Sequence, residues 1–77
     1  MENEKDFDER KRIGKLIAEL RAKKGFSQVE LGELSGVGYS HIGRIELGKY
    51  SIGIDTLKKI ADALDCEIKL VAKINAE

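Results

Sequence analysis

Apolar residues recur at helical spacing through the first third of the chain. They fall at i, i+3, i+4 and i+7, the pattern of one buried helix face, and they are Ile13, Leu16, Ile17 and Leu20. Acidic residues precede this stripe and basic residues follow it, which suits the two ends of a helix dipole. Gly25 then provides a residue that readily ends a helix in the left-handed conformation. The pattern predicts a first helix from about Asp8 to Lys24.

A second, shorter helix follows directly. Ser27 and, three residues later, Glu30 form a capping box, in which each side chain accepts a backbone N–H at the start of the helix. This helix begins at Gln28 and stops at Gly36, so it has only about two turns and depends on packing against its neighbours. Its apolar residues are Val29, Leu31 and Leu34.

Two further helices complete a predicted four-helix unit. The third runs from Tyr39 to about Leu47, with Ile42 and Ile45 buried and a glycine after it. The fourth covers residues 54–64. Its stripe consists of Ile54, Leu57, Ile60, Ala61 and Leu64. The fold class expected from these patterns is all-α.

The last segment, "CEIKLVAKI", changes its period from helical spacing to strict alternation. A strand needs a partner for its backbone groups, and no other stretch of the chain alternates in this way. We therefore expect a C-terminal β-strand that pairs with a second copy of the chain across a homodimer. A fifth helix or a frayed tail are the alternatives. The residues expected at the dimer contact are Ile68, Leu70, Ala72 and Ile74.

The joint between the second and third helices has the glycines of a helix-turn-helix, in which two short helices cross closely. Gly32 provides the small residue at the crossing, and Gly36 the turn residue with positive φ. Val37 fits as the apolar plug of the turn, and Gly38 as an acceptable N-cap. Three units result: a flexible acidic leader over residues 1–7, a helical domain over 8–64, and a dimerisation strand and tail over 65–77.

Length, composition and charge restrict the classes of protein to which this chain can belong. The 77 residues suffice for one small domain, 36% of them are charged, and the single cysteine excludes a disulfide within the chain. With no membrane-length apolar run, the expected location is cytoplasmic. Net charge is zero, but five acids crowd residues 1–9 and seven bases crowd residues 10–24. This basic stretch is either a solvated helix face or part of a surface for nucleic acid.

The motifs of the chain do not indicate a nucleotide-binding or catalytic site. The stretch "GVGYSHIG" follows a helix and lacks the spacing of a dinucleotide fingerprint, and no P-loop lysine follows it. His41 is the only histidine, with no acid or nucleophile arranged near it in the sequence. Cys66 is more simply a core or interface residue than a redox site. We expect no enzyme activity, no cofactor and no metal site.

A longer pattern has a specific likeness. "FSQVELGELSGVGYSHIGRIELGK", with "LRAKKG" before it and "IDTLKKIADAL" after it, resembles the phage repressor and Cro family of DNA-binding domains, also called XRE-like. The resemblance covers about residues 10–64. It implies that double-stranded DNA is the partner and that Tyr39–Leu47 is the recognition helix in the major groove.

The resemblance also implies roles for individual residues. The outward face of the recognition helix would meet DNA bases with Tyr39, Ser40, Gly43 and Arg44. A guanidinium can bond guanine O6 and N7 together, so Arg44 is the main candidate base reader, with a phosphate contact as its alternative. Phosphate contacts would come from Gln28, His41 and Lys49. Arg21 and Glu46 resemble the family's internal ion pair.

A narrower likeness arises at the end of the chain. Asp65 stands where a glycine usually follows the fourth helix, and the chain goes straight into the predicted strand. This arrangement resembles the HipB-type antitoxins, which implies a toxin protein as a further partner. The expected function is sequence-specific DNA binding as a homodimeric regulator, a repressor of a palindromic operator. The alternative is a protein-interaction module of the same fold that has lost DNA binding.

Overall fold

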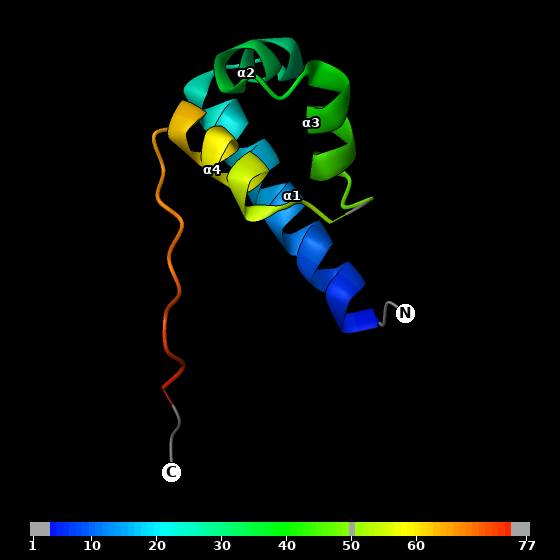
Figure 1. Ribbon diagram of the computed structural model, residues 1–77, viewed down its shortest axis with the longest axis vertical. Coiled ribbons are helices and arrows are strands. Elements are labelled where there is room, and N and C mark those ends of the chain that lie inside the picture. The colour runs from blue at the N-terminus through cyan, green and yellow to red at the C-terminus, as the bar shows by residue number, and fades with distance from the viewer. Residues whose placement is uncertain (1–3, 50, 75–77) are drawn as a thin grey trace.

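The computed structural model describes residues 4–49 and 51–74 and forms four helices over that part of the chain (Figure 1). They are α1 (Glu4–Lys24), α2 (Gln28–Ser35), α3 (Tyr39–Glu46) and α4 (Ile54–Ala63). The all-helical class and the four helices are confirmed. Helix α1 begins four residues earlier than the apolar stripe indicates, at Glu4 instead of Asp8. Residues 4–7 therefore belong to a helix and not to a flexible leader, while residues 1–3 lie outside the described residues.

Two helix ends are closed by caps, of which the sequence indicates the first. At α2, the Ser27 hydroxyl accepts from the Glu30 amide at 3.0 Å, and the Glu30 carboxylate accepts from the Ser27 amide at 2.8 Å. At the end of α4, Asp65 has a φ of 59°, the left-handed conformation that glycine usually provides. The amide of Cys66 then donates to the carbonyl of Ala61 at 2.8 Å, which closes a Schellman motif.

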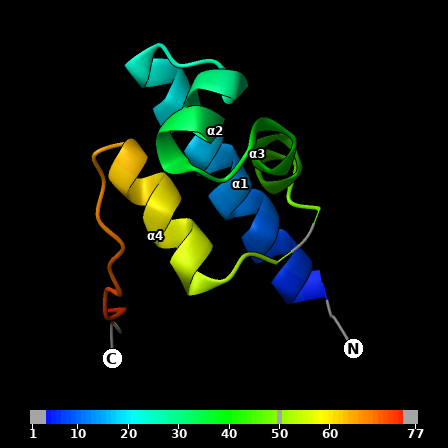
Figure 2. The ribbon, with the colours of Figure 1, turned by 45° about the horizontal axis from the view of Figure 1, so that its top comes forward.

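One small core joins all four helices. Helix α2 packs against both α3 and α4, and α1 packs against α3. Figures 1 and 2 show α3 and α4 lying apart, with α2 bridging them at one end of the bundle. The buried cluster at the centre consists of Ile17, Leu31, Ile42, Ile45, Ile60 and Leu64. Val37 packs against this cluster from the turn, as predicted for a plug.

Two glycines allow helices to approach closely. A Cβ built on Gly32 would lie 2.7 Å from the amide nitrogen of Tyr39, and one built on Gly14 would lie 2.3 Å from the carbonyl oxygen of Ile45. Gly32 therefore has the role expected of it at the crossing of α2 and α3. Gly14 has the same role between α1 and α3, which its place in a long helix gave no reason to expect.

Several residues of the predicted apolar stripes are not buried. Leu16, on the stripe of α1, is 45% exposed, and Ile54, at the start of α4, is 66% exposed. On α2, Val29 and Leu34 are 49% and 59% exposed. Helices α2 and α3 each pack against two other helices, whereas α1 packs mainly against α3 and α4 mainly against α2, so the core does not cover every apolar position.

The C-terminal segment leaves the helices as an extended chain (Figure 1). Residues 66–74 form no β-strand and no β-ladder within the single chain, and Leu70, Val71 and Ile74 are at least 82% exposed. The predicted strand needs a second copy to pair with, so the strand and the dimer both remain predictions. No helix in the described residues is long and apolar enough to cross a membrane.

Candidate nucleic-acid interface

Helix α3 presents a polar face to solvent. Ile42 and Ile45 are 0% and 3% exposed and fix the orientation of the helix against the core. On the opposite side, Tyr39 is 63% exposed, and Ser40 and Arg44 are also exposed. Three of the four predicted base-contacting residues therefore lie together on one accessible helix face.

Gly43, the fourth, occupies a different position. It is half-buried on the side of α3 that faces the start of α2. A Cβ built on it would meet the Gln28 side chain at 3.5 Å, an ordinary van der Waals contact. The structure thus brings a predicted base-contacting residue and a predicted phosphate ligand side by side. The protein itself leaves room for an alanine here, unlike at Gly32.

The same Gln28 side chain belongs to a network below α3. Its Nε2 donates to Glu46 Oε1 at 2.9 Å. Arg21 donates to both oxygens of that carboxylate, through Nε at 2.6 Å and Nη2 at 3.1 Å. A third bond from Arg21 Nη1 reaches the carbonyl of Phe26 at 2.9 Å. One side chain of α1 thereby links the α1–α2 connection to the end of α3.

The electrostatics of this network follow from its burial. The side chains of Arg21 and Glu46 are 20% and 7% exposed, so water screens their attraction less than at the surface. The hydrogen bonds to Glu46 raise the pKa of Arg21 above its ordinary value. The sequence likeness suggested the pair of charges, but the amide of Gln28 as a third member was missed. Its position at the start of a helix pointed only to an outside ligand.

The segment after α3 adds positive charge next to the end of that helix. Lys49 is exposed, and its amide donates to the carbonyl of Arg44 at 3.1 Å, which keeps it next to the helix end. A Cβ on Gly48 would lie 2.8 Å from the Cα of Lys11, so the basic stretch of α1 passes directly beside this segment. His41 is exposed on α3. The proximity of Lys11 could not be read from spacing, because it depends on how α1 crosses the end of α3.

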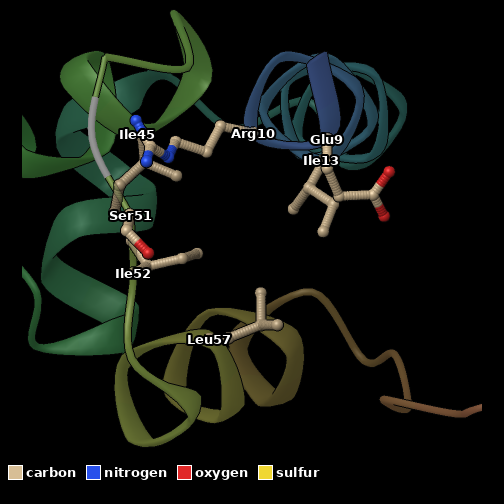
Figure 3. A pocket seen from close by; sticks show the side chains of 7 residues that line it. All are labelled: Glu9, Arg10, Ile13, Ile45, Ser51, Ile52 and Leu57. Atoms are coloured by element: carbon tan, nitrogen blue, oxygen red, sulfur yellow. The ribbon is translucent and has the colours of Figure 1, made fainter. Parts of the chain in front are cut away.

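A cleft lies away from the exposed face of α3. It has a volume of about 330 Å³ between the first half of α1, the loop before α4, and α4 itself (Figure 3). Arg10 points from α1 toward Ile45 and Ser51, while the Glu9 carboxylate points away from them. Hydrogen bonds from Arg12 lower the pKa of Glu9, and the charge of Lys73 adds to this effect. Among the described residues, no group of three or more His, Cys, Asp or Glu side chains could hold a metal ion.

Comparison with known proteins places this geometry in a family. A family model described as "Helix-turn-helix" matches residues 17–71, which include all of α2, α3 and α4. The HTH-type transcriptional regulator PuuR of Escherichia coli (strain K12) is 45% identical over 47 residues, and the protein of the same name from Shigella flexneri is equally similar. These matches cover 61% of this chain and 25% of each relative, so the chain spans a quarter of their length. The protein belongs to the XRE-like helix-turn-helix family.

Proposed function

We propose that the protein binds double-stranded DNA in a sequence-specific way and acts as a homodimeric transcriptional regulator, a repressor of a palindromic operator. One observation carries the proposal: the exposed face of α3, with Tyr39, Ser40 and Arg44, stands beside the N-terminus of α2 and the exposed Lys49. An exposed helix next to a helix N-terminus and a lysine suits a major groove between two phosphate backbones. Family membership supports the same reading.

The roles of the side chains follow from their chemistry. Arg44 reads a guanine through paired bonds to O6 and N7. Lys49 binds a phosphate as a point charge, and His41 adds a further hydrogen-bond donor. Gln28 keeps one amide hydrogen on Glu46 and has a second amide hydrogen for a phosphate. The bond to Glu46 fixes the side chain before DNA arrives, so less conformational freedom is lost on binding.

The homodimer is supported by the exposed C-terminal segment. Residues 66–74 alternate apolar and mostly polar positions, and their backbone forms no ladder within the chain. Two copies paired there would be related by a two-fold axis. Their α3 helices would then enter successive major grooves about 34 Å apart on one face of the DNA. The HipB-type likeness extends the proposal to a toxin as a further partner, and that extension rests on the likeness alone.

Removing the Arg44 side chain tests the base-reading role. We expect Arg44→Ala to weaken binding to sites selected from random DNA by about 1–3 kcal/mol and to relax base preference at one position of each half-site. The free energy of binding to selected and to scrambled duplexes, measured by fluorescence anisotropy, separates the roles. Lys59→Ala, at an exposed cation on α4, serves as the control and should change neither value. Equal losses on both duplexes would make Arg44 a phosphate ligand, and no binding to any duplex would refute the proposed function.

A further inference from the structure

The start of the C-terminal segment is unevenly buried in the single chain. Cys66 is half-buried and packs against the core, and Ile68 is 39% exposed, whereas Leu70 is fully exposed. On the alternate positions, Lys69 Nζ lies 3.9 Å from Glu67 Oε1, with both side chains largely in solvent. Residues 66–69 all line the space beside α1 and α4, and among them Cys66 and Ile68 are more buried than Glu67 and Lys69.

An apolar groove lies under the start of this segment. It has a volume of about 240 Å³ and runs between α1, α4 and residues 66–69. Leu16 and Leu20 line it from α1, and Leu57 lines it from α4. Cys66 and Ile68 line it from the segment itself. The groove explains why Leu16 is exposed although it stands on the apolar stripe of α1.

We propose that residues 66–74 of two copies pair as an antiparallel ribbon whose two-fold axis passes through Leu70. This inference rests on the homodimer of the proposed function and specifies its register. Leu70 then lies opposite Leu70 of the second copy, and Ile68 opposite Ala72. Glu67 lies directly opposite Lys73 of the second copy, once at each end of the ribbon. Opposite charges directly across an antiparallel ladder attract, and like charges repel.

Neighbouring registers are worse for this sequence. Residues directly opposite one another in an antiparallel pair lie on the same face of the ribbon. The two-fold axis must therefore pass through a residue, and each alternative register moves that axis to another residue of the segment. An axis at Lys69 puts Lys69 opposite itself, and an axis at Val71 puts Lys69 opposite Lys73. An axis at Ile68 leaves residues 71–74 without a partner, because the residues before Cys66 belong to α4 and its cap. On the sequence, an axis at Ala72 puts Glu67 opposite Glu77, a pair of like charges. Of these five axes, the one at Leu70 pairs all of residues 66–74 and places no like charges opposite one another.

This register also supplies a cover for the groove. Ala72 and Ile74 of the second copy come to lie beside Ile68 and Cys66, on the face directed to the helices. Ile74, 96% exposed in the single chain, would then reach the edge of the groove near Leu16. The end of each segment packs on the helices of the other copy. The ribbon thus adds buried apolar area to a small core.

A scan with single cysteines reads the register. In a Cys66→Ser background, cysteine is placed in turn at positions 68, 69, 70, 71 and 72, and disulfide formation is measured under mild oxidation. Residues opposed across a ladder have Cα atoms about 4.5–5.5 Å apart, within disulfide range. If the axis lies one position away from a residue, the Cα atoms of that residue in the two copies are about 8 Å apart, which is beyond disulfide range. We expect Leu70→Cys to crosslink at least 10-fold faster than the other four variants.

Sedimentation of the unmodified chain keeps the two proposals separable. A dimer whose crosslinking peaks at another position would overturn the register and leave the proposed function intact. A chain that stays monomeric would overturn the dimer and the register together. Parent and cysteine variants should give the same helical circular dichroism, because residues 66–74 lie outside the helices.

Charge reversal provides an independent check of the same register. Glu67→Lys and Lys73→Glu each place like charges opposite one another at both ends, so each should raise the dimer dissociation constant by about 10-fold. The double variant restores opposite charges and should return the constant to within about 2-fold of the parent. The charge of Lys73 also lowers the pKa of Glu9 in its own chain. Lys73→Glu and the double variant both lose this effect, so it does not contribute to the difference between them. Failure of the double variant to recover would contradict the Glu67–Lys73 pairing.

Discussion

A single carboxylate, that of Glu46, ties three segments of the domain together. It accepts hydrogen bonds from Arg21 of α1 and from Gln28 of α2, and it is itself the last residue of α3. Its side chain is only 7% exposed. A charge this far from water depends on its partners, so removing the Arg21 guanidinium would leave the carboxylate without its counter-charge. The network therefore sets the position of α3 relative to α2, on which the proposed DNA contacts depend.

Replacing Glu46 with glutamine removes the charge and keeps the shape. We expect Glu46→Gln to lower the free energy of unfolding by about 2–3 kcal/mol, because the Arg21 guanidinium loses its counter-charge in a largely buried site. The raised pKa of Arg21 means that its contribution is complete below the unfolded-state pKa and is lost only far above neutral pH. The cost should therefore be equal at about pH 7 and pH 9. Urea unfolding at one protein concentration measures it.

The chain offers a matched control for that measurement. Lys58 and Asp62 form a pair of similar length, 2.7 Å, with side chains 64% and 59% exposed. Asp62→Asn should change the free energy of unfolding by less than about 0.5 kcal/mol, because solvent screens this pair. If the two substitutions cost the same, burial would not be what makes the Glu46 network matter.

The sequence could indicate some of these contacts and not others. Arg21 and Glu46 were paired by a likeness in pattern, and their chemistry makes them obvious partners. Gln28 bonds to Glu46 across the domain, and nothing in local spacing encodes that distance. Arg44 and Tyr39 were placed on an outer face simply because Ile42 and Ile45 had to be inside. Positions fixed by helix periodicity were predictable, whereas contacts fixed by how helices cross were not.

At the scale of elements, the helix boundaries were the most predictable feature. Capping residues and glycines act through local backbone chemistry, so the starts of α2, α3 and α4 fell where the sequence indicated. Burial along each stripe was less predictable. Leu16 belongs to a regular apolar stripe and still faces a groove, because α1 and α4 do not close over it. Whether an apolar position is covered depends on its neighbours, and Leu70, Val71 and Ile74 stay at least 82% exposed in the single chain.

Two glycine-to-alanine changes test whether each glycine is needed for packing within the domain. Gly32→Ala should destabilise the domain by about 1–3 kcal/mol, because its Cβ would lie 2.7 Å from backbone at the start of α3. Gly43→Ala should instead stabilise the domain by about 0.5–1 kcal/mol, since it restores helix propensity and meets only the Gln28 side chain at 3.5 Å. Urea unfolding of both variants gives the two signs. A destabilised Gly43→Ala variant would show that the helix needs this glycine for its own packing.

At the scale of the whole molecule, zero net charge does not prevent binding to a polyanion. Four of the five acids in residues 1–9 belong to the first turns of α1, while Arg44 and Lys49 stand at the end of α3. What DNA meets is the charge of the docking face, because charges beyond about 8–10 Å are screened at physiological salt. Residue order alone gave the segregation of charge, but only the fold shows that the basic part of α1 passes beside Gly48.

The salt dependence of binding measures how many charges meet phosphates. If Arg44 reads a base and Lys49 binds a phosphate, with Lys11 or His41 adding one further contact per protomer, a dimer makes about four phosphate contacts. The logarithm of the binding constant should then fall with the logarithm of salt concentration with a slope of about −3.6. Lys49→Ala should reduce the slope to about −1.8, whereas Lys59→Ala should leave it unchanged. Anisotropy titrations between about 50 and 200 mM salt measure all three slopes. A protein-interaction module that has lost DNA binding would give no such series, and a slope unaffected by Lys49→Ala would remove that residue from the interface.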